Sequence, residues 1–428
     1  MNNSKRRSTG FEVITTFITK IIFLGGSFIV SVLLARILGP EGKGIITALF
    51  VVPNIMISLA DLGVRQASAY FIGRKIYSVQ DILSSSLMLW VFSSSLSMLI
   101  VFIYYLSPLT DNYGWLLTLI ALTFIPIKIL ATYLQGIIQG QQKIKNINIK
   151  TLINFIVNLL GVLILVWAFD LGIYGATAVT FLVAISGLTY YVIVVKRSAT
   201  FQIKYIKPVP QDMFTKGIAF AVSLFVLQLN YKVDIVILET MVSSAEVGIY
   251  SVGINLAELI WQLPAAISIV LFARSANSKT DQEASLRSAR LLRLSLASLF
   301  VVILAFGLTS DFFVTFLYGA EFSQSATIIN ILLPGVLVMV ISKILHPSLA
   351  ARGYPLYGIA AFILPLILNV VLNYIFIPIY GIYGAAYTST ISYIIGGLSY
   401  GLIYSKKENI KLLDLLIIKK EDIKLIIN

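Results

Sequence analysis

The sequence predicts an all-α polytopic membrane protein in which twelve transmembrane helices form two lobes of six, and three observations support that prediction. Of the 428 residues, 58% are hydrophobic and only 12% are charged, about half the charged share of an ordinary soluble domain. The mean hydropathy of +0.93 comes from apolar runs spread along the whole chain. Each run is close to the roughly 20 residues that a helix needs to cross a bilayer. A five-residue motif near the middle of the chain recurs near its end, which indicates a duplicated unit.

The apolar runs give twelve predicted spans. Short segments that contain Gly, Pro, Asn, Asp or Lys separate neighbouring runs and mark the turns between helices. The first run follows the basic segment Lys5–Arg7 and is too long for the apolar part of a signal peptide, so we expect a retained helix. In order, the predicted spans are Glu12–Leu38, Ile45–Ile72, Leu83–Leu106, Trp115–Ile138, Leu152–Phe169, Tyr174–Val195, Gly217–Glu239, Val247–Phe272, Leu291–Thr309, Ser325–Leu349, Leu356–Phe376 and Gly384–Tyr404.

The distribution of Lys and Arg predicts how these helices cross the membrane. Of the 32 Lys and Arg residues, 25 lie at the termini or in and beside the connections after every second predicted helix, whereas the opposite connections contain only Lys43. Basic residues collect on the cytoplasmic side of membrane proteins. We therefore expect a multi-pass protein of the cytoplasmic membrane with both termini in the cytoplasm. The same bias accounts for the formal net charge of +13 without nucleic-acid binding.

An internal repeat predicts two lobes of the same topology. The segment Gly172–Ala176 reads Gly-Ile-Tyr-Gly-Ala, and the same five residues recur at Gly381–Ala385, 209 positions later. Each copy lies between the fifth and sixth predicted helix of its half. Since six helices start and end on the same side, two such units in tandem are parallel repeats. The predicted division is a first lobe at 1–200, a cytoplasmic linker at 201–216, a second lobe at 217–405 and a basic amphipathic tail at 406–428.

Several classes of function are excluded by what the sequence lacks. It has no cysteine and one histidine, so disulfides, thiolate chemistry and His-rich metal sites are ruled out. It contains no G-x-x-x-x-G-K-[ST] loop for ATP hydrolysis, and its outward connections are too short for a catalytic domain. We expect a transporter and not an enzyme, with no cofactor and no bound metal, driven by a Na⁺ or H⁺ gradient or by the membrane potential.

Charged side chains inside the predicted helices are the candidate functional residues, because each costs about 3 kcal/mol at the bilayer centre unless it faces water or a partner. Lys20 and Lys128 lie deep, and we expect them to face a wet, substrate-binding cavity, with a buried ion pair as the alternative. Asp61 and Arg65 are four residues apart, so they either neutralise one another on one helix face or line that cavity.

The second half of the chain has the opposite balance of deep charge. A polar stripe on the eighth predicted helix consists of Asn255, Glu258 and Gln262. On the seventh predicted helix Asn230 and Asp234 share a face, while Lys232 points elsewhere. Deep charges sum to +2 in the first half and −1 in the second, so we expect an anionic substrate to bind the first half. The candidates are Lys20, Arg36, Arg65, Lys128 and Lys232 for a cationic substrate cavity, and Asp61, Asp234 and Glu258 for ion coupling.

Two further features have simpler interpretations. Arg36 and Lys343 lie near the ends of predicted helices, where a long side chain can reach the interface. The tail Lys411–Ile427 mixes Leu and Ile with Lys and Asp. It is too short and too charged to cross the bilayer, and we expect an interfacial helix on anionic lipid.

Four short motifs resemble one family of membrane exporters. They are Leu34–Gly44, Ala60–Gly63, Ser244–Tyr250 taken together with Asp234, and Gly381–Ala386. Their order and their positions on the predicted helices are similar to those of the Wzx-type O-antigen (polysaccharide) flippases of the MOP exporter superfamily. Arg36, Asp61 and Asp234 are the positions that match these motifs residue by residue, whereas Lys20, Lys128 and Lys232 are candidates from the charge argument alone.

The resemblance implies a V-shaped pair of six-helix lobes with a cationic lumen. Such a protein flips an undecaprenyl-pyrophosphate-linked oligosaccharide, the repeat unit of O-antigen or a related surface polysaccharide such as that of lipopolysaccharide, to the outer leaflet by alternating access. Its partners would be that substrate, membrane lipids, and the polymerase and chain-length proteins of the same pathway.

Three other functions are the alternatives. A cation-coupled multidrug exporter of the related MATE type should have a net acidic lumen, and the first half here is net basic. A peptidoglycan-precursor flippase typically has fourteen helices, where twelve are predicted. A membrane-embedded polymerase or ligase would have a large outward loop, and the sequence contains none.

Overall fold

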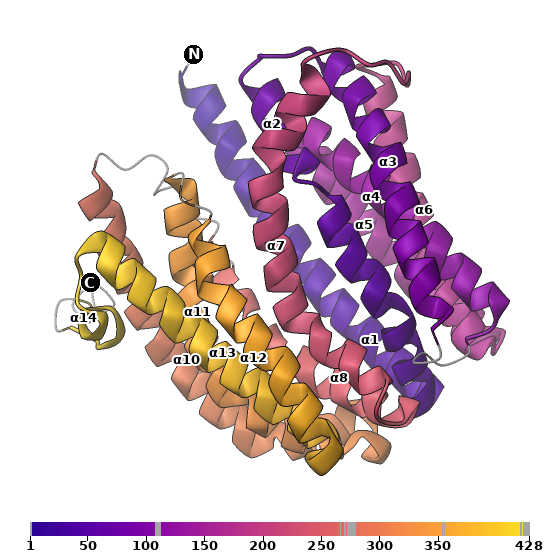
Figure 1. Ribbon diagram of the computed structural model, residues 1–428, viewed down its shortest axis with the longest axis vertical. Helices are drawn as coiled ribbons and strands as arrows, with labels where there is room; N and C mark the ends of the chain where they lie inside the picture. Colours follow the sequence, from indigo (N-terminus) through magenta and orange to yellow (C-terminus); the bar gives the residue numbers. More distant parts are fainter. Residues whose placement is uncertain are drawn as a thin grey trace. The chain divides into compact units, whose positions relative to one another are not determined.

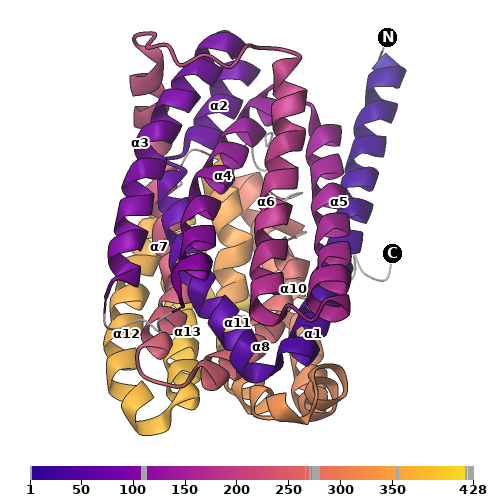
Figure 2. The same ribbon diagram turned by 90° about the vertical axis from the view of Figure 1, so that its right-hand side faces the viewer.

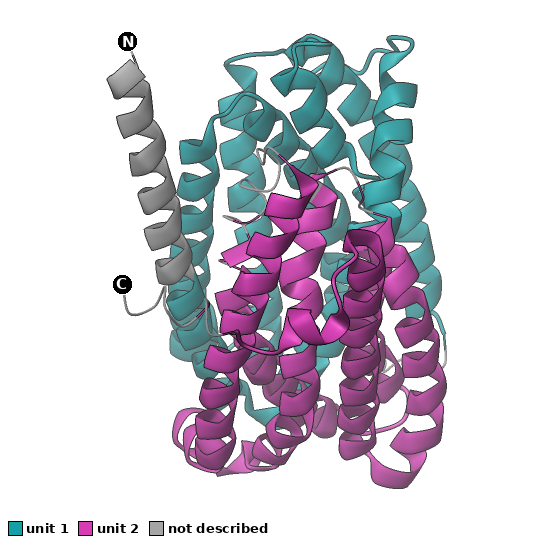
Figure 3. Ribbon diagram, turned by 90° about the vertical axis from the view of Figure 1, so that its left-hand side faces the viewer, with its two compact units in different colours: residues 1–222 teal, residues 223–428 magenta. Residues whose placement is uncertain are grey.

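All regular secondary structure in the residues described by a computed structural model is helical. The structure describes residues 2–107, 113–265, 267–268, 271, 280–352, 354, 356–419 and 422, with side chains from Leu24 onward and without that of Ala351. The chain divides into two compact units, residues 1–222 and 223–428, which are coloured separately in Figure 3.

Unit 1 is a bundle organised around α4. Its elements are α1 (Asn2–Ala60), α2 (Val64–Gly73), α3 (Val79–Tyr105), α4 (Trp115–Gly140), α5 (Ile144–Gly161), the π-helical η1 (Val162–Ala168), α6 (Gly172–Lys196) and the first part of α7 (Val209–Glu239). Helix α4 packs against α2, α3 and α6, and Figure 2 shows these helices side by side. Tyr133 and Tyr191 are fully buried in the core between them.

Unit 2 is organised around α11 and α13. It contains the rest of α7, then α8 (Ser244–Leu259), α10 (Asp281–Tyr318), the 3₁₀ turn η2 (Ala320–Phe322), α11 (Gln324–Ala351), α12 (Tyr357–Tyr380), α13 (Ile382–Glu408) and the short α14 (Leu412–Leu416). Helix α13 packs against α11 and α12, and α11 also contacts α8 and α10 (Figure 1).

The repeated Gly-Ile-Tyr-Gly-Ala motif has the same conformation in both units. Its first glycine has a left-handed backbone, with φ 51° at Gly172 and φ 56° at Gly381, and helix α6 or α13 begins there. A Cβ on the second glycine would lie 2.9 Å from the Leu165 carbonyl oxygen at Gly175 and 2.3 Å from the Phe376 carbonyl oxygen at Gly384. Both positions therefore require glycine for the close return of one helix against the preceding one.

The described residues contain nine helices that are long and apolar enough to cross a membrane, which agrees with a multi-pass membrane protein. The first of them, Leu24–Gly73, contains parts of two predicted spans. Helix α1 continues from one span into the next across a bend at Gly39 (φ 65°, ψ −178°). Helices α8 and α13 are outside the nine. The all-α prediction is confirmed, whereas these nine candidate spans are fewer than the twelve predicted.

Several predicted boundaries are wrong. The span predicted at Ile45–Ile72 is interrupted at residues 61–63, so Asp61 and Arg65 do not share one helix. The fifth helix begins eight residues before its predicted start at Leu152. The ninth predicted span, Leu291–Thr309, is part of the 38-residue α10, because Thr280 caps an additional polar segment at its start.

The eighth span and the tail also differ from their predictions. Helix α8 ends at Leu259, and Ile260 and Trp261 form a turn before Pro264. The predicted end of that span, at Phe272, lies outside the described residues. The helix expected over Lys411–Ile427 is not continuous, because α14 ends at Leu416 and residues 417–419 are not helical. Helix α14 packs against α10 and α13.

Candidate functional site

The break between α1 and α2 forms a polar site in unit 1. Leu62 and Gly63 have left-handed backbones, φ 47° and 65°. The Ala60 carbonyl oxygen accepts a hydrogen bond of 2.7 Å from the buried Tyr133 hydroxyl. Asp61 is only 6% exposed, and its Oδ1 has no hydrogen-bond partner among the residues that the structure describes. A buried carboxylate oxygen without a partner is costly, so this position suits a bound cation, a proton or water.

Two lysines lie close enough in unit 1 to repel one another. The Lys128 Nζ lies 5.3 Å from the centroid of the Phe124 ring, and the Lys150 Nζ lies 5.6 Å from that of Tyr191. Lys150 interacts electrostatically with Lys128. Within the described part of the chain, neither ammonium has a carboxylate within 4.0 Å. Both side chains are half-buried, so this pair of cations favours binding of an anion.

Gly187 on α6 makes room for the second lysine. A Cβ at this position would lie 2.8 Å from the Lys150 Cε and 2.8 Å from the Asn154 Oδ1. The Lys150 stem therefore runs against the α6 backbone. Sequence reasoning assigned Lys150 to a cytoplasmic connection and missed it, because α5 begins earlier than predicted. The signal was present in the polar positions Asn146 and Asn154, four residues on either side of Lys150, which lie on one helical face with it.

In unit 2 an ion pair joins α7 to α8. The Lys232 Nζ lies 3.6 Å from Glu258 Oε2, and the Tyr393 hydroxyl of α13 donates a hydrogen bond of 3.0 Å to Glu258 Oε1. The sequence predicts that Lys232 points away from the face of α7 shared by Asn230 and Asp234, and its ion-pair partner is Glu258 on α8. The two side chains are 25% and 18% exposed, so the pair is partly screened and can exchange partners.

A second cation, Lys343, lies between aromatic rings. Its Nζ is 4.4 Å from the ring centroids of both Tyr231 and Trp261, which are themselves buried. The Trp261 indole is fixed by a hydrogen bond of 2.9 Å to the Val336 carbonyl oxygen. The expected reach of Lys343 towards the interface is wrong, because two cation–π contacts hold the ammonium inside unit 2. The charge of Glu258 also acts on it.

Asp234 is a fully buried acid of unit 2. It is 0% exposed and accepts hydrogen bonds from the Tyr250 hydroxyl at 2.5 Å, the Ser389 hydroxyl at 3.0 Å and the Ile235 N–H at 2.8 Å. Among the described residues, the buried polar atoms on α7, α12 and α13 without a hydrogen-bond partner include Asn230 Nδ2, Asn369 Nδ2, Asn373 Oδ1 and Thr388 Oγ1. Unit 2 thus contains a polar interior with capacity to bind a small ion or water.

The remaining predicted residues are less informative. Lys20 lies in the part of α1 whose side chains are outside the described residues. Arg36 is exposed shortly before the bend at Gly39. Arg65 is half-buried at the start of α2, where its charge attracts Asp61, but the two form no ion pair within 4.0 Å in the described structure. In unit 2 Asn255 and Gln262 are exposed, unlike Glu258.

Three solved structures share the fold over nearly the whole chain. A multidrug resistance MATE family transporter of the MOP superfamily, in an inward-facing conformation, has a TM-score of 0.71 at 15% identity, covering 93% of this chain and 98% of its own. The lipid II flippase MurJ, inward closed, has 0.70 at 18% identity, covering 95% and 89%. The Vibrio cholerae MATE transporter VcmN has 0.60 at 15% identity, covering 96% and 100%. The fold of this chain is therefore the one that these transporter and flippase structures share.

The sequence also matches a family model described as polysaccharide biosynthesis protein, over residues 8–279. The chain belongs to this polysaccharide biosynthesis protein family, which confirms the predicted family resemblance. None of the curated proteins compared with it matches its sequence.

Proposed function

We propose that this protein flips an undecaprenyl-pyrophosphate-linked oligosaccharide across the cytoplasmic membrane by alternating access. The observation that carries the proposal is the pair Lys128 and Lys150, in the part of the chain that matches the polysaccharide biosynthesis family. These two cations interact, and neither has a carboxylate within 4.0 Å among the described residues. A pyrophosphate carries the charge and the acceptor oxygens that two ammonium groups can bind together. The likeness to a lipid II flippase supports a lipid-linked substrate.

The acids supply the coupling step in this proposal. Asp234 and Glu258 hold the coupling cation or proton, Na⁺ or H⁺, while the cations of unit 1 hold the lipid anion. Support comes from the buried position of Asp234 and from the ion pair of Glu258 with Lys232, which a bound cation would replace. One charge moved through 100 mV is worth about 2.3 kcal/mol, which is enough to bias a two-state cycle.

The substrate step is tested with lysine variants. Lys128→Ala and Lys150→Ala should each lower flipping of a labelled lipid-linked oligosaccharide in proteoliposomes about tenfold, because a charge-assisted hydrogen bond contributes about 1.5–3 kcal/mol. Lys→Arg variants should retain more activity than Lys→Ala, since the charge is preserved. The matched control is Lys145→Ala, an exposed lysine one and a half turns earlier on α5.

The same assay separates this proposal from multidrug export. If the Lys128→Ala/Lys150→Ala double variant flips the lipid at the wild-type rate, the dibasic site is refuted. If the wild type transports a cationic dye but not the lipid-linked sugar, multidrug export of the MATE type replaces the flippase function.

A further inference from the structure

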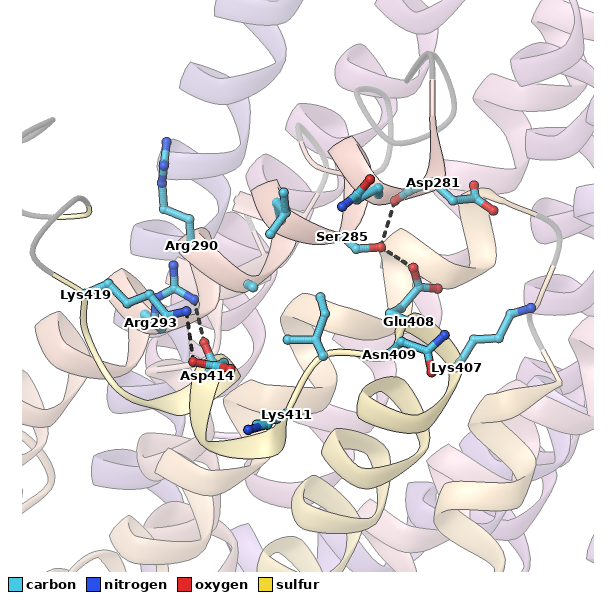
Figure 4. A pocket seen from close by; sticks show the side chains of 14 residues that line it. Asp281, Ser285, Arg290, Arg293, Lys407, Glu408, Asn409, Lys411, Asp414 and Lys419 are labelled. Carbon is cyan, nitrogen blue, oxygen red and sulfur yellow. Dashed lines mark hydrogen bonds and ion pairs between the residues drawn. The ribbon is translucent and has the colours of Figure 1, made fainter.

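An open cavity lies in unit 2 between the start of α10, the end of α13 and the tail. Its volume is about 800 Å³. Figure 4 shows the side chains that line it from all three segments, among them Ser285 of α10, Glu408 of α13 and Lys411 of the tail. None of these residues belongs to the proposed substrate or coupling site.

The lining of this cavity, called here the basic cavity, is net positive. It includes five basic residues and three acidic ones. The acids are already engaged: Glu408 and Asp281 pair with Arg352 at 3.0 and 3.5 Å, and Asp414 pairs with Lys419 at 2.9 Å. In contrast, Lys411 is exposed and has no carboxylate within 4.0 Å in the described part of the chain.

The tail that forms one wall is held by Arg293. Arg293 donates two hydrogen bonds to Asp422, at 2.6 and 2.9 Å, and a third of 2.6 Å to the Asp414 carbonyl oxygen. The Arg290 Nε donates a further hydrogen bond of 3.2 Å to Asp422 Oδ1. These bonds lower the pKa of Asp422 to about 2. A depressed carboxylate pKa stabilises the folded tail above its unfolded value, near 4, and the contribution is lost only as the pH falls towards 2. The wall is therefore in place at neutral pH.

An apolar groove continues from the basic cavity. It has a volume of about 400 Å³ and shares Arg293 with the cavity. Its other walls are apolar and come from α10, α11, α13 and the tail, among them Leu296, Phe300, Leu337, Leu398, Leu416 and Ile418. The basic cavity and the apolar groove therefore adjoin at the Arg293 side chain.

The sequence of α10 places this junction at the level of the lipid headgroups. Charged residues recur along the helix up to Arg293, and residues 294–310 contain none. Beyond this border Phe300, Val301 and Leu304 are exposed apolar side chains, as expected of a surface that faces acyl chains. Arg290 and Arg293 lie on the polar side of the border.

We propose that the basic cavity and the apolar groove together bind one anionic phospholipid, with its phosphate near Arg290 and Lys411 and an acyl chain along the groove. The surplus positive charge favours an anionic headgroup over a zwitterionic one. The adjoining groove favours a lipid over a free phosphate, because a small anion would leave the apolar walls uncovered. The bound lipid would tie the tail to the membrane surface beside unit 2.

Native mass spectrometry of the purified full chain tests the site. Phosphatidylglycerol should bind more tightly than phosphatidylcholine with the same acyl chains. The double variant Arg290→Gln/Lys411→Gln should weaken phosphatidylglycerol binding about 25-fold, because each cation near an anionic surface contributes about fivefold. Lys411→Gln alone, at an exposed position without an ion pair, should weaken it about fivefold. Leu398→Asn should weaken it as well by making the groove polar.

The matched control is Lys406→Gln, an exposed lysine of α13 that does not line the cavity, and it should bind phosphatidylglycerol like the wild type. Glycerol phosphate should not compete with phosphatidylglycerol. The proposal is overturned if phosphatidylcholine binds equally well, if Lys411→Gln has no effect, or if glycerol phosphate competes at equal concentration. Tighter binding of a polyprenyl phosphate than of phosphatidylglycerol would also overturn it and would make this a substrate entrance.

Discussion

At the scale of single residues, the charges of unit 2 are stabilised by partners that lie on other helices. Lys232 forms an ion pair with Glu258, and Glu258 accepts a hydrogen bond from Tyr393. Lys343 makes cation–π contacts with the rings of Tyr231 and Trp261. Removing one member of such a set leaves another charge in a poorly solvated position, which costs more than the contact itself contributes. Lys232 and Glu258 are both partly exposed, so each can exchange its partner for another ion.

The variant Glu258→Gln should uncouple transport from its driving gradient. The amide can still accept the hydrogen bond from Tyr393 but carries no charge to exchange between Lys232 and a cation. In proteoliposomes we expect wild-type flux to rise with an imposed Na⁺ or pH gradient and the variant's flux to ignore it. Glu283→Gln is the control, since this exposed residue pairs only with Arg287 on the same helix. Unchanged gradient dependence in Glu258→Gln would exclude a coupling role.

At the scale of elements, interruptions in the helices create the polar sites. The break at residues 61–63 places the buried Asp61 side chain between α1 and α2, and the Ala60 carbonyl oxygen accepts a hydrogen bond from Tyr133 of α4. It is compatible with close packing because the start of α7 approaches it backbone to backbone. A Cβ on Gly217 would lie 2.3 Å from the Leu62 carbonyl oxygen, and a Cβ on Gly63 would lie 2.1 Å from that of Gly217.

Gly217→Ala should therefore destabilise the protein. Within a helix this change gains about 1 kcal/mol of helix propensity, but overpacking against backbone costs about 1–3 kcal/mol or more, and at 2.3 Å the clash should outweigh the gain. We expect a lower melting temperature for the detergent-solubilised variant, measured as the temperature at which heating removes its monodisperse peak in size-exclusion chromatography. Gly25→Ala is the control, since a Cβ there meets nothing within 4 Å. Equal melting of both variants would contradict this account.

At the scale of the whole molecule, charge is distributed unevenly between connections and helices. The basic connections and the tail contain most of the Lys and Arg residues, and this bias predicts the orientation in the membrane. The segment between α6 and α7 contains Lys204 and Lys207 and would therefore lie in the cytoplasm.

Cysteine labelling tests that orientation, because the chain has no cysteine of its own. Tyr205→Cys, at a position 53% exposed between α6 and α7, should react with a membrane-impermeant maleimide only after the cells are opened. Trp115→Cys, at a position 77% exposed at the start of α4, should react in intact cells. The reverse pattern would invert the predicted topology.

The sequence by itself determined the helical class, the repeat and most of the helices, because these depend on local patterns. Apolar run length locates a membrane helix without knowledge of its neighbours. The Gly-Ile-Tyr-Gly-Ala motif could be found twice because a left-handed turn and a close helix return both require glycine at fixed positions. Asp234 and Glu258 were recognisable as candidates because an acid within an apolar run is costly.

Only the tertiary structure decided which charges meet. Lys150 joins Lys128 because α5 begins in a polar segment that no apolar run marks, and because Gly187 on another helix leaves room for its stem. Lys343 is enclosed by rings from α7 and from the turn after α8. Asp422 meets Arg293 across 129 positions of sequence. Such contacts depend on the packing of distant segments, and helical periodicity describes only the face of one helix, not what lies opposite it.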